Sequence, residues 1–426
     1  MSHFDFITYC NEDTIKNILP QNRSSERKLS IREFNDVIIL PSESSFGEYQ
    51  GEICDYRGNL ISDINSNVNY RDITTKIDIS TLNIGECEEE LCIYLGSIPN
   101  CWGHFITDGL SKLWWIKNNI TSEILKQILV VIPYNTKVPK SYILLLTYIL
   151  GVELNIKIVD RIKRYNKVLI PDNAIFIGED GRTYTTEYKA LIENICSNVT
   201  IPSKLKYDNI YLSRSNWIHV NPEFGESAIE KAFNKVGYKS ISPEKYTFEE
   251  QLAMFMNAKS IVSTSGSLAH NSLFCKEGTE IIILRKSSSD CLDYQQMIDQ
   301  MKNHKVTYID CNLSVFLTEH VGLGPFFLYI NDKLSKFFKD RFSININENF
   351  SSKQFLEYSL LCMKRNDFFY RNPSHNELGE YLYKKMSEEL RNEKNIYKRI
   401  YNIIDVLGLN SIKSTFKKIY YKIKRA

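Results

Sequence analysis

The alternation of strand-like and helix-like segments between residues 205 and 312 constrains the fold more than any other feature of the sequence. Five short apolar runs have the composition of β-strands, namely NIYLSR at 209–214, YKSIS at 238–242, KSIVST at 259–264, TEIIIL at 279–284 and VTYID at 306–310. Amphipathic segments separate the first four runs. Strands that alternate with helices form a parallel sheet covered on both faces, so we expect a doubly wound α/β domain here.

Two of the intervening helices have recognisable ends. PEFGESAIEKAFNKVG at 222–237 carries Pro222 near its start and Gly237 after its end, which is the usual asymmetry of helix termini. TFEEQLAMFMNA at 247–258 begins with Thr247 and has Glu250 three residues later, the spacing of a capping box. Helices are therefore predicted over both segments, inside a Rossmann-like domain.

The chain of 426 residues is too long for one ordinary core. Its first half also alternates, with predicted strands at 91–96, 128–133, 156–159 and 167–171, a helix at 139–150, and a helix of about four turns that includes SKLWWIKNNI at 111–120. We expect an α/β domain over residues 1–204, the Rossmann-like domain over 205–312 and a helical extension over 313–426.

Composition and short motifs exclude several classes of protein. The net charge of +2 gives no general attraction to nucleic acid. The ten cysteines form no CxxC pair, and the first residues lack the apolar core of a signal peptide, so we expect reduced thiols in a cytoplasmic protein. The most apolar run, at 142–152, is too short to span a bilayer. Neither HExxH nor GxxxxGK[ST] occurs, and neither does the DxD carboxylate pair that often holds a divalent metal beside a nucleotide sugar.

The stretch STSGSLAHNSLF at 263–274 is a candidate phosphate-binding loop. It follows a predicted strand and opens a predicted helix, so its free N–H groups can hold an anion. Gly266 permits a tight turn, and Ser265 and Ser267 add hydroxyl donors. A simple capped turn is the alternative interpretation.

Arg214 is a second candidate for binding phosphate. It follows the first strand of the same predicted sheet and therefore lies at the same edge as the Gly266 loop, where its guanidinium could hold a diphosphate bidentately. His219, Asn221 and Glu223 come shortly after it. A surface arginine is the default alternative for Arg214, and the capping box already explains Glu250.

His104 and Asp108 in NCWGHFITDGL form the candidate catalytic pair. On a helix that begins near Gly103, they lie one turn apart on the same face. A carboxylate at this spacing orients an imidazole, and either group could remove a proton from a hydroxyl. A buried structural pair is the alternative, and spacing alone favours it.

Taken together, these motifs resemble glycosyltransferase family 61 over residues 50–312. The order is NCWGHFITDGL, then YLSRSNWIHVNPE, then the block from GYKSIS to EIIIL, which is the most specific part. The resemblance implies a GT-B-like fold and inverting transfer from a nucleotide sugar, with UDP as the expected nucleotide and generally no metal. By motif it assigns site roles to Gly103, His104, Phe105, Asp108, Arg214, Asn221, Glu223, Glu250, Gly266 and Asn271.

The sequence departs from the family at three places. Ser263-Thr264-Ser265-Gly266 replaces the usual Gly-Pro-His-Gly, so Ser265 stands where a histidine could contact phosphate. His219 replaces a common second arginine. His270, beside Asn271, is similar to the bacterial capsule branch. These changes bear on the donor sugar more than on the fold.

We therefore expect a GT-B-like α/β glycosyltransferase with two Rossmann-like domains and a helical C-terminal extension. Residues 1–204 would bind a glycan acceptor, in capsular or another surface polysaccharide pathway, and 205–312 the nucleotide sugar. Asp108 is the expected base, with His104 as its orienter or as an alternative base; no metal or other cofactor is expected. Two alternatives remain: a polysaccharide pyruvyltransferase-like enzyme, and a non-catalytic scaffold of a capsule assembly complex.

The C-terminal tail is a candidate membrane contact. On a helix, its apolar residues Phe416, Ile419, Tyr420 and Ile423 form a stripe, and basic residues flank that stripe. The basic residues are Lys413, Lys417, Lys418, Lys422, Lys424 and Arg425. Such a helix can lie on anionic lipid at the inner face of the cell membrane. A helix docked on its own protein is the alternative.

Overall fold

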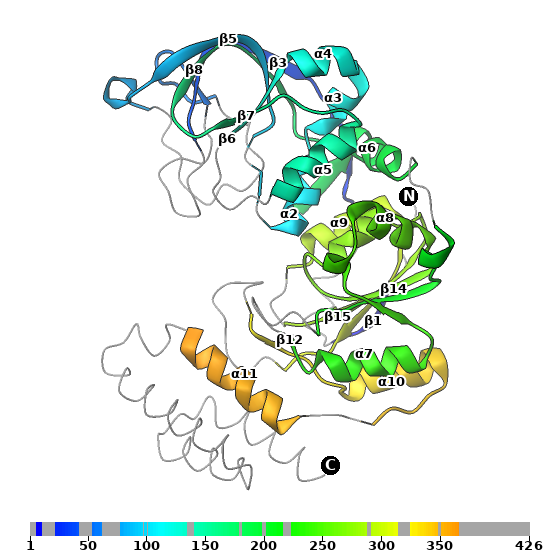
Figure 1. Cartoon of the computed structure of the whole chain (residues 1–426). Helices are drawn as coiled ribbons and strands as arrows, with labels where there is room; N and C mark the ends of the chain where they lie inside the picture. The colour runs from blue at the N-terminus through cyan, green and yellow to red at the C-terminus, as the bar shows by residue number, and fades with distance from the viewer. Residues whose placement is uncertain are drawn as a thin grey trace, which may run out of the picture.

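The computed structural model contains two halves, each built on a six-stranded sheet (Figure 1). The structure describes residues 6–10, 22–41, 53–61, 77–96, 98–99, 101–133, 140–178, 181–197, 202–215, 223–287, 291–313, 324–347 and 351–365. Among these residues, no helix combines the length and the apolar character that crossing a bilayer requires. The basic tail at 413–425 lies outside the described residues, as do His219 and Asn221.

The second sheet is parallel throughout and confirms the predicted α/β fold. Its order is β1 (Phe6–Tyr9), β16 (Lys305–Asp310), β15 (Glu280–Arg285), β14 (Ser260–Thr264), β11 (Asn209–Leu212) and β13 (Lys239–Ile241). The chain runs from β11 out to β13 and then to β14 on the other side of β11, so the strand order reverses between β11 and β14. Ligands of such sheets bind at the carboxyl ends of the strands beside this reversal.

Helices cover both faces of this sheet because its strands are apolar on both sides (Figure 1). In β15, Ile281 and Ile283 pack into one core, whereas Ile282 and Leu284 pack into the other. The helices are α8 (Phe248–Asn257) and α9 (Asp293–Met301) on one face, and α7 (Glu226–Lys235) and α10 (Asp332–Phe342) on the other. The Thr247–Glu250 capping box begins α8, as predicted.

The first sheet is mixed, with order β4 (Ile53–Asp55), β3 (Ile31–Ile39), β8 (Lys163–Pro171), β5 (Gly85–Tyr94), β6 (Leu129–Pro133) and β7 (Ile156–Val159). β5 to β8 pair in parallel, and β3 is antiparallel to both its neighbours. The helices of this half are α2 (Trp102–Ile106), α3 (Leu113–Asn119), α4 (Ser122–Gln127), α5 (Lys140–Leu150) and α6 (Thr186–Ser197). One continuous apolar cluster runs from α5 and α6 to α8 and α9, so the halves share a core.

Several smaller elements lie outside the two six-stranded sheets. β2 (Ser24–Ser25), β10 (Gly181–Thr185) and β9 (Ile175–Gly178) form a three-stranded sheet near the junction of the halves. β12 (Glu223–Phe224) pairs in parallel with β17 (Phe326–Phe327), and α11 (Ser352–Arg365) contacts both strands. The 3-10 helix η6 (Ala269–Phe274) follows the Gly266 loop, where a short helix was predicted.

The structure departs from the expected domain boundaries at both ends of the second half. β1 was expected in the first domain, but it pairs with β16 at the edge of the second sheet. α10 was expected in a separate helical extension, but Leu334, Phe337 and Phe338 pack into the core of the second half. β1 adds an edge strand to the second sheet, and α10 covers one of its faces. Both segments therefore belong to the second half, although their positions in the chain predicted otherwise.

The stretch after Cys101 is not one helix of four turns. It breaks into α2, the 3-10 helix η3 (Asp108–Leu110) and α3. The break occurs at Thr107, whose φ of −97° and ψ of −82° are not helical and whose hydroxyl donates to the Gly103 carbonyl oxygen at 2.9 Å. Likewise, α7 begins at Glu226 and not near Pro222, because the preceding Gly225 has a φ of +82°, which is not helical. Glycine is needed at this position, since an added Cβ would lie 1.9 Å from the Leu328 carbonyl oxygen.

Candidate active site

Three chain segments meet at the carboxyl edge of the second sheet and form a positively charged cradle. Arg214 follows β11, Gly266 follows β14 and Lys286 follows β15. Gly266 has a φ of +105°, and a Cβ added there would lie 3.3 Å from Lys286 Nζ. Glycine is therefore required for the turn and keeps the loop backbone close to the lysine ammonium. Ser265 Oγ accepts a hydrogen bond from the Lys286 backbone N–H at 3.3 Å, which ties the two loops together.

A buried carboxylate holds the two cations of the cradle. Glu223 Oε1 lies 3.1 Å from Lys286 Nζ and 3.6 Å from Arg214 Nη1, and its side chain is fully buried. Glu226 lies beside it and accepts from the Arg214 backbone N–H at 2.9 Å. Burial, followed by the charge of Glu223, raises the pKa of Glu226 well above its usual range. Two cations thus face one carboxylate, an arrangement that can accept an anion.

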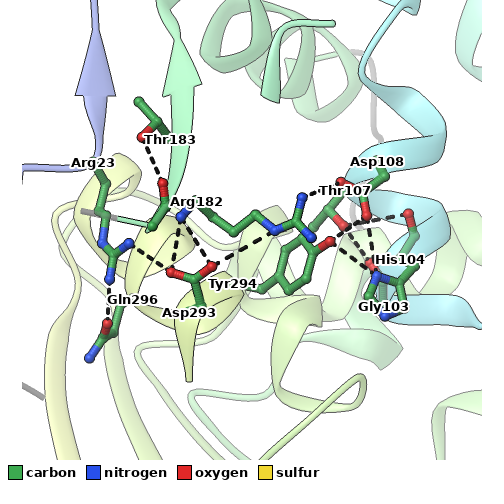
Figure 2. A network of polar contacts seen from close by, with 11 residues as sticks. Arg23, Gly103, His104, Thr107, Asp108, Arg182, Thr183, Asp293, Tyr294 and Gln296 are labelled. Carbon is green, nitrogen blue, oxygen red and sulfur yellow. Dashed lines mark hydrogen bonds and ion pairs between the residues drawn. The ribbon is translucent and has the colours of Figure 1, made fainter. Parts of the chain in front are cut away.

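His104, Asp108 and Tyr294 form a triangle of polar atoms at the junction of the two halves (Figure 2). His104 Nδ1 lies 3.2 Å from Asp108 Oδ2 and 3.2 Å from the Tyr294 hydroxyl oxygen, and that hydroxyl donates a short hydrogen bond to Asp108 Oδ2. The His104 side chain is 41% exposed, whereas that of Asp108 is 1% exposed. Only the imidazole can therefore meet a substrate.

The hydrogen-bond partners of His104 determine which of its two ring nitrogens carries the hydrogen. Burial, followed by the charge of Asp108, raises the pKa of Tyr294, so its hydroxyl stays protonated and donates a hydrogen bond to Asp108 Oδ2. Both neighbours of Nδ1 then present oxygen lone pairs, which requires a hydrogen on Nδ1. The lone pair of neutral His104 is left on Nε2, which makes no hydrogen bond to any described residue.

The segment from Cys101 to Gly103 touches the Gly266 loop directly. A Cβ added at Gly103 would lie 2.6 Å from His270 Nδ1 and 2.8 Å from Ser267 Oγ. Cys101 Sγ lies 3.1 Å from the same Ser267 hydroxyl, and Trp102 Nε1 donates to Asn271 Oδ1 at 2.9 Å. Gly103 therefore allows α2 and this loop to approach each other. Ser267, His270 and Asn271 all lie at this contact between the halves.

The Glycosyltransferase 61 family model matches residues 102–282. The match contains the His104–Asp108 pair, Arg214 and the Gly266 loop, and it ends within β15. The chain carries a glycosyltransferase family 61 domain. Such a domain indicates a glycosyltransferase enzyme, which acts on a sugar donor and an acceptor. No curated protein matches the chain.

His270 of the family 61 domain lies between the two parts of the site. Burial lowers its pKa to about 3, and the nearby charges of His104 and Lys286 act in the same direction. Its Nδ1 is buried without a hydrogen bond in the described structure. An uncharged imidazole thus lies between the exposed His104 and the cradle.

One other expected site residue, Glu250, has a structural role. Glu250 caps α8 by accepting from the Thr247 backbone N–H at 3.0 Å, as the capping box predicted. In the described part of the chain, no group of three or more His, Cys, Asp or Glu side chains could hold a metal ion.

Sequence reasoning missed three residues of the site. Lys286 follows its strand as Arg214 follows β11, so the rule that selected Arg214 could have selected it as well. Arg182 and Tyr294 offer no local signal, because each reaches Asp108 across a long stretch of chain.

Proposed function

We propose that this glycosyltransferase is an inverting enzyme that moves a sugar from a nucleoside diphosphate sugar to a hydroxyl of a glycan acceptor, without a metal ion. The observation that carries this proposal is the contact between the two halves. It brings the exposed imidazole of His104 on one half next to the Gly266 loop of the cationic cradle on the other. An inverting displacement needs a base on one side of the anomeric carbon and stabilisation of the leaving diphosphate on the other.

The proposed reaction follows from these positions. His104 Nε2 takes the proton of the acceptor hydroxyl as the hydroxyl oxygen attacks the anomeric carbon. The bond between that carbon and the diphosphate oxygen breaks, and its electron pair leaves with the nucleoside diphosphate. Arg214, Lys286 and the N–H groups of the Gly266 loop stabilise the negative charge that develops there.

The burial of Asp108 supports a different assignment of the base from the one expected from the sequence. Asp108 was expected to be the base, with His104 as its orienter or as an alternative base. However, Asp108 is almost completely buried, and its oxygens face Tyr294, His104 and Arg182. We therefore propose that His104 is the base and that Asp108 orients it and stabilises the imidazolium that forms, a division of labour known from other His–Asp pairs.

A product analysis tests this proposal against its two rivals. The protein is incubated in EDTA with a panel of nucleotide sugars led by UDP-sugars, with glycan acceptors, and separately with phosphoenolpyruvate. We expect release of nucleoside diphosphate and a product whose anomeric proton signal in NMR shows inverted configuration. Turnover of phosphoenolpyruvate would establish a pyruvyltransferase, and no turnover of any donor would favour a scaffold. Loss of activity in EDTA that Mn²⁺ restores would contradict the metal-free mechanism.

We also propose that the enzyme serves capsular or other surface polysaccharide synthesis at the cytoplasmic face of a membrane. The similarity of His270–Asn271 to the capsule branch and the amphipathic pattern of the basic tail support this role. Basic residues near an anionic surface contribute roughly 1 kcal/mol each. Truncation after Asn410 should therefore abolish sedimentation with anionic liposomes and leave nucleotide binding unchanged. Equal sedimentation of both forms would rule out a membrane role for the tail.

A further inference from the structure

The proposed base is held from both halves of the molecule. His104 and Asp108 belong to α2 and η3 beside the first sheet, whereas Tyr294 belongs to α9, which packs on the second sheet. The Tyr294 hydroxyl makes two contacts, because it donates to Asp108 Oδ2 and lies 3.2 Å from His104 Nδ1. The imidazole ring also packs edge-on against the Tyr294 ring, with 5.1 Å between ring centroids.

Arg182 supports Tyr294 and Asp108 together (Figure 2). Its Cζ lies 4.4 Å from the Tyr294 ring centroid, and its Nη1 lies 3.6 Å from Asp108 Oδ1. A guanidinium over an aromatic face and beside a carboxylate is attracted by both. Arg182 therefore holds the Tyr294 ring and the Asp108 carboxylate in place through atoms that do not contact His104.

Arg182 is itself anchored to α9 by a buried ionic cluster. Its backbone N–H donates to both carboxylate oxygens of Asp293 at 3.0 Å, and Arg23 Nη1 donates to Asp293 Oδ1 at 2.7 Å. Gly181 makes this possible, because a Cβ there would lie 2.1 Å from Arg23 Nη1 and 2.3 Å from Asp293 Oδ1. Arg23 also donates to Gln296 Oε1 at 2.7 Å. The cluster joins β2, β10 and α9 into one support.

We propose that Tyr294 is a positioning residue for His104, held in place by Arg182, so that the donor-binding half completes the base of the acceptor-binding half. This inference rests on the proposed role of His104 as the base. The base then has its full set of partners only when α9 packs against α2 and η3. Tyr294 contacts neither Arg214 nor Lys286 in the described structure, so donor affinity does not depend on it.

Tyr294→Phe removes the hydroxyl and keeps the ring under Arg182. We expect kcat to fall by about 10- to 100-fold, because a small displacement of a catalytic group costs that much. KM for the donor should stay within about twofold of the parent value, since the cradle is untouched. Tyr308→Phe is the matched control: Tyr308 is also buried and donates to a buried carboxylate, Asp299, at 3.1 Å, yet it does not contact His104. Its kcat should match that of the parent.

A second experiment, in which Tyr294→Phe is combined with His104→Gln, separates a positioning role of Tyr294 from a general effect on stability. In His104→Gln protein, Tyr294→Phe should slow turnover by no more than about twofold, because residues that act as a unit are not additive. Nitrogen-15 NMR of histidine-labelled parent protein provides a measurement without any variant. It should show that neutral His104 carries its hydrogen on Nδ1 and not on Nε2.

The outcomes distinguish this inference from the proposed function. If His104→Gln turns over normally, the base assignment fails and the inference fails with it. If His104→Gln is slow but Tyr294→Phe keeps parental kcat, only the inference is overturned. An equal loss from Tyr294→Phe in both backgrounds, or a hydrogen on His104 Nε2 in the neutral parent, would also overturn it.

Discussion

Replacing His104 with alanine should slow turnover by about 10²- to 10⁴-fold while nucleotide binding and folding are retained. The size of the loss follows from the removal of a general base. Retention of folding follows from exposure, because the side chain is 41% exposed and its hydrogen bonds lie on one edge of the ring. Steady-state kinetics, thermal denaturation and nucleotide titration measure the three quantities.

His304→Gln is the matched control for that variant. His304 also pairs with an aspartate, since its Nδ1 lies 3.0 Å from Asp299 Oδ1, but both side chains are fully buried. Its replacement should lower the melting temperature and leave the turnover of the folded fraction unchanged, because a buried hydrogen-bonded group contributes to stability. The opposite pattern at His104, early melting with normal turnover, would show that the His104–Asp108 pair is structural.

Asp108→Asn should affect both turnover and stability. The substitution removes the acceptor-only group that holds the His104 tautomer, so turnover should fall. It also leaves the buried Arg182 guanidinium with one carboxylate partner, Asp293, in place of two, and losing a charged partner in a buried site typically costs about 1–3 kcal/mol. His104→Ala therefore separates catalysis from folding more cleanly than Asp108→Asn does.

Replacing Arg214 or Lys286 with alanine should weaken nucleoside diphosphate binding by about 2 kcal/mol or more, roughly 30-fold, because charge-assisted contacts to the diphosphate are lost. Lys286→Ala also leaves Glu223 with fewer cationic partners, so melting temperature must be measured alongside affinity. Titration with UDP, GDP and CMP measures the effect.

Lys259→Ala is the control for the two cradle variants. Lys259 lies in the same half and pairs with Asp208 at 2.8 Å, but its side chain is 75% exposed. It directly precedes β14, at the amino edge of the parallel sheet and therefore at the opposite edge from the cradle. Its replacement should leave nucleotide affinity unchanged. If Arg214→Ala and Lys286→Ala fold and bind all three nucleotides as the parent does, the donor diphosphate does not lie on the cradle.

Local pattern was sufficient to predict most of the second sheet. β14 and β15 are apolar runs buried on both faces, and the Thr247–Glu250 spacing alone located the start of α8. Arg214 and the Gly266 loop could be assigned to one edge because the carboxyl ends of parallel strands share an edge. These features depend on short stretches of chain.

Features that depend on distant contacts could not be predicted in this way. β1 is in the second sheet because it pairs with β16, about 300 residues later, and no residue of β1 indicates that partner. Spacing shows that His104 and Asp108 are neighbours but not which of them is exposed, so it could not decide which of them can meet a substrate. Gly103 lies against Ser267 and His270 of the other half, a contact that no local pattern could predict.

The structure of the protein in complex with an unreactive nucleoside diphosphate sugar analogue tests the central claim most directly. We predict that the diphosphate lies within hydrogen-bond distance of Arg214, Lys286 and the Gly266 loop, and that the anomeric carbon faces the side from which His104 Nε2 is reached. A diphosphate bound away from these three groups, or an anomeric carbon turned away from His104, would contradict the account.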